Sequence, residues 1–440
     1  MKILIVNYRY FVSGGPERYM FNLTEGLTSR GHEVIPFSIR YSANDPTPYA
    51  QYFVEPLGSP DEVTFAEQCL TAGTVWRTMQ RLFYASDVER AVRRIVSETR
   101  PQIAYVLHYL RKLSPSLLVG LKRAGVPVVV RLSDYGMLCA EQHCLRGGVA
   151  CELCVLGNLW PSIRYGCVQN SRTASALNAL ATCYHRWRRY FDLIDVFVTT
   201  TQIMHRMMLA AGFPERRLRC VPTYVDGTTF RPSTGFEKSP YLAYAGALRA
   251  IKGVHVLVDA LAILRRTRPD LPLCAKIAGA GDPGYSAHLE RKVREAGLQD
   301  VVELVGELNA TALATLLNKA LVAVVPSVCY ENLPNAVLES YACGTPVIAS
   351  DHGALRECVV NGETGYRFPP GDAAGLAGQL EHCLGHPQEV LAMAKNARRV
   401  AETVYSPAHH LDALERLLDE ILGTKPRPTA RPDRVVGAAR

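Results

Sequence analysis

Short apolar runs alternate with longer segments of helical periodicity along most of the chain. Residues 3–6 and 34–37 are apolar and rich in β-branched side chains, and between them Met20, Leu23 and Leu27 recur at helical spacing. This succession of strand, helix and strand recurs further along and predicts an α/β fold built on parallel sheets. The predicted strands are residues 3–6, 34–37, 103–107, 126–132, 196–199, 241–244, 273–278, 301–304, 321–325 and 347–349.

The most sharply bounded unit lies between residues 321 and 349. Residues 321–325 are apolar and predict a buried strand, after which comes a polar loop. Pro334 stands where a first helical residue would, and its fixed φ suits the start of a helix. The helix is expected to run to about Cys343 and to be closed by Gly344, before strand 347–349.

Two carboxylates mark this unit as a candidate site. Glu331 lies in the loop, and Glu339 follows eight positions later on the apolar helix, on the same face as Asn335. A buried carboxylate needs hydrogen-bond donors, which the hydroxyl groups of a sugar or ribose would supply. The free backbone N–H groups around residues 333–336 would bind a phosphate. The pattern therefore fits a nucleotide-sugar pocket, although solvated charges on a loop and a helix remain the alternative.

Four motifs of the chain occur in a recognisable order. They are the E-x7-E pair, the ENLPN loop, the segment LESYACGTPVIAS and the later NGETGY loop. Together they resemble the donor-site signature of glycosyltransferase family 4, the retaining nucleotide-sugar transferases of the GT-B fold. The resemblance implies two Rossmann-like domains facing across a cleft, and no catalytic metal. It also implies that Glu339 binds ribose hydroxyls, that Glu331 binds those of the sugar, and that further donor contacts come from Asn332, Leu333, Pro334 and Asn335.

Two glycine loops follow predicted strands. Gly14 and Gly15 precede the first helix, where the backbone can approach a phosphate closely, although a plain loop is the alternative. Gly279 and Gly281 belong to a second loop, GAGD, after strand 273–278. The family carries glycine loops at comparable places, so all four glycines are expected near the donor.

Lys252 stands just before a predicted helix, where its ammonium group can reach a diphosphate. Family members commonly carry an arginine five positions earlier, and this chain has Ala247 there. Arg249 is the candidate substitute.

Candidate acceptor-side residues follow two strands of the first half. His108 comes after strand 103–107, and Ser133 and Asp134 come after strand 126–132. Polar groups at such strand ends point into the crevice where open α/β sheets bind ligands. The family places a histidine before the aspartate, and Ser133 replaces it here. His108 and Asp134 are therefore the candidates for handling the acceptor, with a structural role as the alternative for His108.

The length of the chain and its 48% hydrophobic content allow more than one core in 440 residues. We expect an acceptor-binding domain over residues 1–235 and a nucleotide-sugar-binding domain over residues 236–405. Residues 406–422 resemble the helix that returns to the first domain in GT-B enzymes. The basic tail, residues 423–440, is expected to be disordered.

The formal charge of +8 permits attraction to anionic lipid or phosphate. No run approaches the ~18 apolar residues of a membrane span, and the first strand is too short for a signal peptide. Basic residues gather between Arg77 and Arg94 and around Trp187–Tyr190. They predict either solvated protein surface or contact with lipid headgroups or acceptor phosphate at the inner face of the cell membrane.

Thirteen cysteines without an export signal favour a reducing cytosol. Several of them lie in an insertion, residues 139–167, which contains one C-x-x-C. A structural zinc site is one interpretation, and scattered thiols or a labile disulfide are the other. The cysteines concerned are Cys139, Cys144, Cys151, Cys154 and Cys167, of which the last four are the candidate ligands.

These features predict a retaining glycosyltransferase that uses a nucleotide diphosphate sugar and no further cofactor for catalysis. The expected acceptor is a glycan or a lipid-linked molecule, in the synthesis of cell-surface polysaccharide or glycoconjugate, and no nucleic-acid partner is expected. Ser133 and Ala247 favour the alternative of a GT-B-like epimerase or a relative that binds without transfer.

Overall fold

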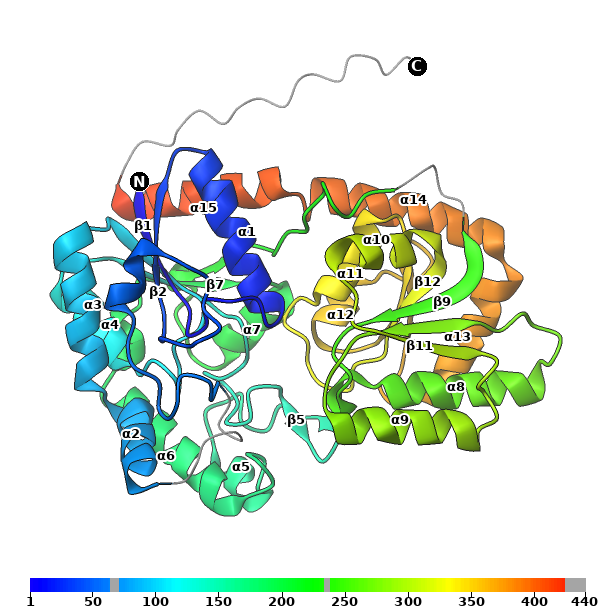
Figure 1. Cartoon of the computed structure of the whole chain (residues 1–440), viewed down its shortest axis with the longest axis horizontal. Helices are drawn as coiled ribbons and strands as arrows, with labels where there is room; N and C mark the ends of the chain where they lie inside the picture. The colour runs from blue at the N-terminus through cyan, green and yellow to red at the C-terminus, as the bar shows by residue number, and fades with distance from the viewer. Residues whose placement is uncertain (64–70, 233–237, 424–440) are drawn as a thin grey trace, which may run out of the picture.

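The computed structural model describes residues 1–63, 71–232 and 238–423, which form two α/β halves side by side (Figure 1). Each half is built on a six-stranded sheet, in the order β2-β1-β3-β4-β7-β8 in the first and β11-β10-β9-β12-β13-β14 in the second. Every pair of neighbouring strands in both sheets is parallel. Such sheets need helices on both faces, which the connections between the strands supply.

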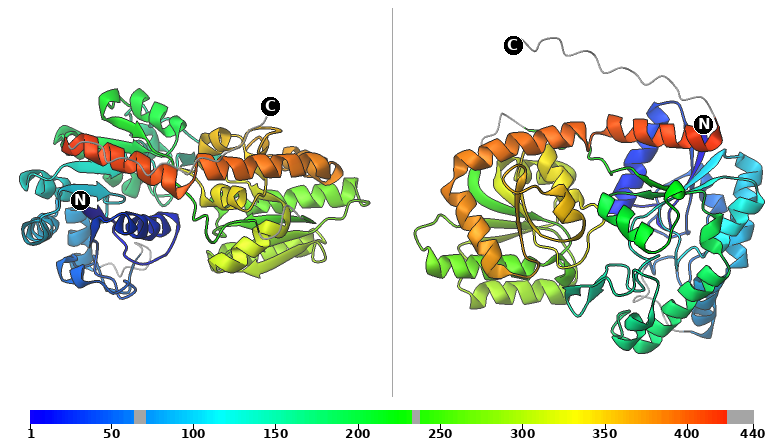
Figure 2. Two further views of the ribbon diagram at one scale, coloured as in Figure 1. Left: turned by 90° about the horizontal axis from the view of Figure 1, so that it is seen from above. Right: turned by 180° about the vertical axis from the view of Figure 1, so that it is seen from behind.

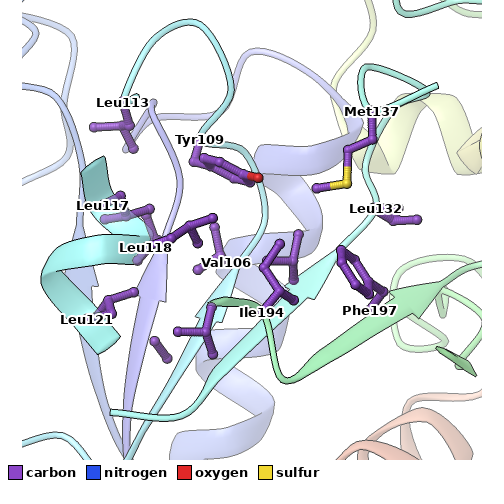
Figure 3. Close-up of a cluster of buried hydrophobic side chains, with 14 of the residues drawn as sticks. Val106, Tyr109, Leu113, Leu117, Leu118, Leu121, Leu132, Met137, Ile194 and Phe197 are labelled. Atoms are coloured by element: carbon purple, nitrogen blue, oxygen red, sulfur yellow. The ribbon is translucent and has the colours of Figure 1, made fainter. Parts of the chain in front are cut away.

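The first sheet packs its apolar strands against helices on either side. On one face, Leu117, Leu118 and Leu121 of α4 contact a core that includes Val106 and Phe197 (Figure 3). The strands are β1 Lys2–Val6, β2 Glu33–Phe37, β3 Ile103–Val106, β4 Val128–Arg131, β7 Val196–Thr199 and β8 Leu218–Cys220, and an antiparallel hairpin is made by β5 Leu145–Arg146 and β6 Val149–Ala150. The α-helices are α1 Gly15–Ser29, α2 Ala72–Phe83, α3 Ser86–Thr99, α4 Ser116–Arg123, α5 Trp160–Arg164, α6 Arg172–Trp187 and α7 Gln202–Ala210.

The second sheet is covered in the same way. One face packs on α8 and α13, and the other on α10, α11 and α14. The strands are β9 Ser239–Ala245, β10 Ala275–Ala278, β11 Val302–Gly306, β12 Ala320–Val325, β13 Val347–Ser350 and β14 Gly365–Phe368. The helices are η4 Ala250–Lys252, α8 Val254–Thr267, α9 Pro283–Glu295, α10 Ala310–Lys319, α11 Asn335–Ala342, α12 Gly353–Cys358, α13 Ala373–Gly385 and α14 Pro387–Thr403.

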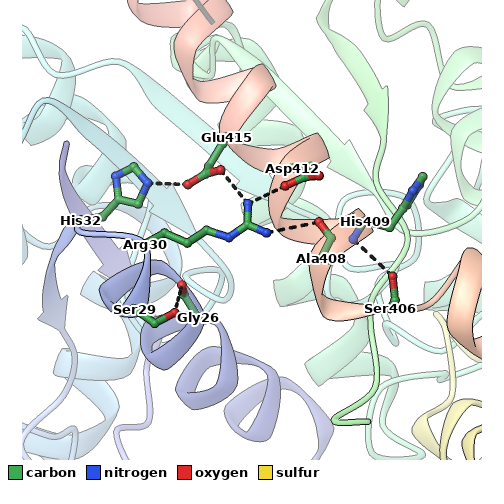
Figure 4. Close-up of polar contacts among 9 residues, drawn as sticks. All are labelled: Gly26, Ser29, Arg30, His32, Ser406, Ala408, His409, Asp412 and Glu415. Atoms are coloured by element: carbon green, nitrogen blue, oxygen red, sulfur yellow. Dashed lines mark hydrogen bonds and ion pairs between the residues drawn. The ribbon is translucent and has the colours of Figure 1, made fainter. Parts of the chain in front are cut away.

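The last helix, α15 Pro407–Leu422, returns to the first half and packs beside α1 (Figures 1 and 2). Its Leu414 is fully buried in a cluster with residues of α1 and the first sheet. Arg30, after the end of α1, donates hydrogen bonds to Asp412 at 2.6 Å and to Glu415 at 2.7 Å (Figure 4). The predicted return helix is therefore present and is held by both apolar and ionic contacts.

All ten predicted strands are present, with ends that differ by up to two residues. The short edge strands β8 and β14 were not predicted. One local prediction was wrong: Pro334 has ψ 125°, which is extended, so it precedes the helix and α11 begins at Asn335. The predicted domain boundary at residue 235 and tail residues 424–440 lie outside the described residues.

Candidate active site

A cavity of about 530 Å³ lies between the two halves, where the carboxyl ends of strands from both sheets face each other. From the first half it is lined by the loop before α1 and by the segment that follows β4. The second half contributes the loops after β9, β10 and β12, together with the first turns of α11. The predicted site residues in its wall are Gly14, Gly15, Asp134, Lys252, Gly279, Glu331, Asn332, Leu333, Pro334, Asn335 and Glu339.

Glu331 is held in an ion pair with Lys252 at the floor of this cavity. The Lys252 Nζ lies 2.6 Å and 2.9 Å from the two carboxylate oxygens, and the Ser327 hydroxyl donates to Oε1 at 2.6 Å. Burial alone would raise the pKa of the Glu331 carboxyl, but Lys252 and Ser327 hold that pKa below its ordinary value. Burial would likewise lower the pKa of Lys252, which Glu331 raises instead. Both groups are therefore charged at neutral pH.

Glu339 is compensated differently, by a residue of the other half. It is 5% exposed on α11, and Arg18 of α1 donates to its Oε1 at 2.6 Å. Burial raises the pKa of Glu339 above its ordinary value, and the Arg18 guanidinium only partly offsets that effect. The acceptor atoms of this carboxylate and the N-terminus of α11 face the same cavity.

Asp134 and His108 meet beside the cavity. His108 Nε2 lies 3.4 Å from Asp134 Oδ2, and the other carboxylate oxygen accepts a bond from the Gly136 backbone N–H at 2.7 Å. Burial would raise the pKa of Asp134, but His108 and the Gly136 N–H hold it below its ordinary value. Asp134 lines the cavity, whereas His108 stands behind it. The pair predicted from sequence is thus brought together, and of the two half-buried side chains only Asp134 belongs to the cavity wall.

Glycines allow the two halves and their loops to approach closely. A Cβ on Gly15 would stand 3.3 Å from the side chain of Asn335, so the start of α1 faces the start of α11. Gly279 has φ +146°, and a Cβ there would overlap the Gly246 carbonyl oxygen at 1.9 Å. Gly281 likewise faces the Leu248 backbone, at 2.2 Å, but it does not line the cavity. Gly281 therefore lets two backbone segments pack closely and is not placed to contact a ligand in the cavity.

Two other predicted donor residues differ from expectation. Arg249 is exposed outside the cavity wall, although its charge acts on Lys252. The Asn332 side chain donates to the Leu132 carbonyl at 2.7 Å and accepts from the Thr200 hydroxyl. Its amide therefore joins the two halves and is not free for a ligand.

Sequence reasoning missed two arginines that line the cavity from the first half. Arg18 follows the glycine loop in the segment GGPER. Arg131, the last residue of β4, is buried, stacks its guanidinium 4.1 Å from the centre of the Tyr19 ring and bonds to Ser133 and Thr223. A basic residue in the first turn of the helix after a glycine loop, or at the end of an apolar strand, was the available signal.

The spacing of the cysteine insertion left a structural zinc site and scattered thiols as alternatives, and the structure does not confirm the zinc site. Cys139, Cys151, Cys154 and Cys167 line one narrow pocket, and Cys144 hydrogen-bonds to Cys139 and lowers its pKa to about 6. Among residues 1–63, 71–232 and 238–423, however, no group of three or more His, Cys, Asp or Glu side chains could hold a metal ion. All the cysteines of these ranges are free thiols.

Comparison with known protein families covers both halves. Residues 14–223 match the glycosyl transferase 4-like domain, and residues 226–400 match glycosyl transferases group 1. The chain belongs to the GT4-type glycosyltransferases. The two matched regions divide the chain between the two sheets, on either side of the cavity.

Curated relatives of this GT4-type chain match over part of their length. Glycogen synthase of Mycobacterium tuberculosis is 39% identical over 169 residues, which is 38% of this chain and 39% of that protein. The MMP alpha-(1->4)-mannosyltransferase of Mycolicibacterium hassiacum is 36% identical over 195 residues, or 44% and 46% of the two chains. The chain thus spans less than half the length of these relatives.

Solved structures show the GT-B fold over nearly the whole chain. Sucrose-phosphate synthase from Thermosynechococcus elongatus superposes with a TM-score of 0.70 and 20% identity, covering 96% of this chain and 99% of that one. Anabaena HepE, solved in complex with UDP, gives 0.65 and 16%, covering 95% and 100%. The predicted fold, two Rossmann-like halves with a returning helix, is confirmed. No helix in the described part of the chain is long and apolar enough to cross a membrane.

Proposed function

We propose that this GT4-type chain transfers a glycosyl group from a nucleotide diphosphate sugar to an acceptor, with retention of the anomeric configuration. The observation that carries the proposal is the composition of one cavity. Its wall includes the carboxylates Glu331 and Glu339 together with the basic side chains Arg18, Arg131 and Lys252. Carboxylates bind the hydroxyl groups of sugar and ribose, and fixed cations stabilise the negative charge that develops on a departing diphosphate.

In this proposal the second half holds the donor. Lys252, at the end of η4 and before α8, and the N-terminus of α11 face the diphosphate. Glu339 accepts bonds from the ribose hydroxyls and Glu331 from those of the sugar. Arg18 and Arg131 add positive charge from the first half, which compensates for Ala247 in place of the family's arginine.

The first half would bind the acceptor. Asp134 lies in the cavity wall with its carboxylate oriented by His108, so it can accept a bond from an attacking hydroxyl group. The acceptor we propose is a glycan or a lipid-linked molecule used in building cell-surface polysaccharide or glycoconjugate. The free thiols of the described residues support synthesis in a reducing compartment, at the cytoplasmic face of the membrane.

A donor panel tests the proposal. The full chain is incubated with UDP-, GDP-, ADP- and dTDP-sugars in the presence of membranes and soluble glycans as acceptors. Binding and turnover are followed by mass spectrometry, with NMR of the anomeric proton in any product. We expect one nucleotide class to bind and its sugar to be transferred with retained configuration. Release of a free epimer would assign an epimerase instead, and binding without turnover of any kind would assign a non-catalytic relative.

A further inference from the structure

All three tryptophans of the chain are exposed, and they lie on three neighbouring helices. Trp76 of α2, Trp160 of α5 and Trp187 of α6 keep 65%, 64% and 74% of their surface exposed. Helices α2 and α5 both contact α6, and all three lie at the end of the first half farthest from α15 (Figures 1 and 2). Soluble proteins bury most of their tryptophan surface, so this exposure points to a contact made by the surface.

Exposed and half-buried side chains of α2 and α6 lie next to one another, and we call this set the aromatic face. The Phe83 and Tyr184 rings are 5.5 Å apart, and the Tyr184 and Trp187 rings are 6.0 Å apart. Trp76 precedes Phe83 by seven positions, and Leu180 precedes Trp187 by seven, so each pair shares one side of its helix. The aromatic face thus consists of Trp76, Phe83, Leu180, Tyr184 and Trp187.

The sequence around the aromatic face carries positive charge and no acid. Residues 154–191 contain five arginines and neither Asp nor Glu, and residues 71–86 contain two arginines and no acid. Arg189 forms an ion pair at 2.6 Å with Asp192, which follows residues 154–191. Arg81 is buried and forms an ion pair with Asp87, so the expectation of a surface role for Arg81 was wrong. Within residues 71–86 and 154–191, the exposed arginines for which the structure gives no ion pair are Arg77, Arg164, Arg172 and Arg188.

We propose that the aromatic face and its arginines dock this protein on a bilayer that contains anionic lipid. Tryptophan and tyrosine favour the headgroup level of a membrane, and arginine is drawn to its negative surface. Leu156 and Leu153, exposed at 78% and 51% in the segment that leads to α5, would be buried at the boundary of the acyl chains. Aliphatic side chains gain nothing from a nucleic acid, so charge and apolarity together favour lipid.

The cysteine insertion leads from the cavity wall to α5, the helix that contacts α6 of the aromatic face. Gln142 and His143 line the cavity wall, and Trp160 begins α5 seventeen residues after His143. Between them Glu152 accepts a hydrogen bond from Tyr330, which neighbours Glu331, at 2.5 Å. The role of docking in the reaction rests on the transferase function proposed above. Docking would bring the acceptor side of the cavity near the headgroup of a lipid-linked acceptor.

The tryptophans make the test direct, because all of the chain's tryptophan fluorescence comes from these three residues. The full chain is mixed with vesicles of phosphatidylcholine alone or with ~30% phosphatidylglycerol, at low and high salt, and is followed by sedimentation and by tryptophan emission. We expect cosedimentation and a blue shift with the anionic vesicles at low salt, and release as salt screens the surface.

Three double variants separate apolar from ionic contact. Trp76→Ser with Trp187→Ser should weaken binding at every salt concentration. Arg77→Ser with Arg188→Ser should weaken binding about 25-fold at low salt, since each basic residue near an anionic surface is worth about a factor of five. Arg266→Ser with Arg416→Ser, two exposed arginines on α8 and α15, is the control and should bind nearly as the unmodified chain does.

Nucleotide-sugar binding without vesicles is measured for every variant. Preserved donor binding shows that the variants fold and keeps the docking test separate from the proposed function. Equal recovery in the supernatant with both lipids at low salt would overturn docking while leaving the transferase function standing. A concentration-dependent dimer, or binding to single-stranded RNA, that is lost with the tryptophan variants would also overturn it, by assigning the face to a second copy or to nucleic acid.

Discussion

At the scale of single residues, the carboxylates Glu331 and Glu339 in the cavity wall are compensated in different ways. Glu331 meets a lysine from its own half, and its pKa is lowered as a result. Glu339 meets an arginine from the opposite half, and burial still keeps its pKa raised. The first carboxylate is therefore part of a prebuilt ion pair, whereas in the proposed function the second exchanges Arg18 for the hydroxyl groups of the donor.

Replacing Glu339 should weaken the donor complex. In Glu339→Gln each charge-assisted hydrogen bond to ribose becomes a neutral one, which should cost about 1 kcal/mol for each bond. Isothermal titration with the preferred nucleotide measures the change, with Glu402→Gln on the exposed side of α14 as the control. Unchanged donor affinity in a folded Glu339→Gln protein would remove this residue from the site.

Replacing Lys252 should destabilise the fold as well as weaken donor binding. Lys252→Met leaves the Glu331 carboxylate buried without its partner, and the loss should be about 3 kcal/mol, at the low end for a buried pair because the Lys252 side chain is 29% exposed. The double variant Lys252→Met with Glu331→Gln should recover much of the stability but not the donor affinity. Equal stability of single and double variants in urea unfolding would contradict this account of the pair.

The pH dependence of these variants follows from the same pair. With Lys252 present, the folded-state pKa of Glu331 lies below its ordinary value of 4.5. The ion pair therefore stabilises the fold at pH values above 4.5. This stabilisation is lost as the pH falls through the lowered pKa. Without Lys252, burial raises the pKa, and protonation then relieves the unpaired charge. The stability difference between Lys252→Met and the unmodified chain should therefore be largest near pH 7 and smaller near pH 5. A constant difference would contradict the ionic origin of the effect.

At the scale of elements, a single turn places Lys252 beside Glu331. Gly253 ends η4 with φ +71°, and a Cβ there would lie 1.9 Å from the Pro326 carbonyl oxygen at the end of β12. The turn after β9 and the loop after β12 therefore fit together only with glycine at this position. Local sequence could place the lysine before a helix, but it could not show this contact with a strand more than seventy residues away.

Gly253→Ala should be more harmful than an alanine at a matched glycine. Gly297 has a similar φ, +65°, and a Cβ there would meet nothing within 4 Å, so Gly297→Ala should cost only the backbone strain of about 1–2 kcal/mol. Gly253→Ala adds the overlap with Pro326, which should lower the free energy of unfolding by at least about 1 kcal/mol more. It should also lower nucleotide affinity by displacing Lys252. Thermal unfolding and nucleotide titration compare the two. Equal effects in both assays would show that the close approach is unimportant.

The returning helix α15 supports the first half through Leu414. Leu414→Ala should lower the free energy of unfolding by about 2–5 kcal/mol, because the side chain is fully buried against α1. Arg416→Ala, on the exposed side of the same helix, should stay within about 0.5 kcal/mol of the unmodified chain. A Leu414→Ala protein as stable as the Arg416→Ala protein would mean that α15 is not part of the core.

At the scale of the whole molecule, short-range patterns predicted more of the structure than long-range contacts did. The central strands are apolar and β-branched, and the order of strands and helices followed from them. The edge strands β8 and β14 each contain an arginine and no β-branched residue, so they lack that pattern. The Arg18–Glu339 pair joins residues 321 positions apart, and no local spacing could predict it.

The cysteine insertion also shows that spacing along the sequence does not determine which side chains meet in the structure. Its spacing resembles that of metal ligands, but in the described residues its thiols pack in a narrow pocket without gathering into a group that could hold an ion. Spacing along the chain constrains which side chains can meet, and the packing of the surrounding loops decides whether they do.

The central claim is that the cavity between the two halves transfers a sugar. The most direct measurement follows a labelled sugar from the preferred nucleotide donor, with membranes and soluble glycans supplied in parallel as acceptors. The account predicts that the unmodified chain forms a larger labelled product. Lys252→Met should form that product at least tenfold more slowly, because it loses about one charge-assisted contact to the diphosphate. Label found only in free sugar or in an epimer of the donor, or equal rates for both proteins, would contradict it.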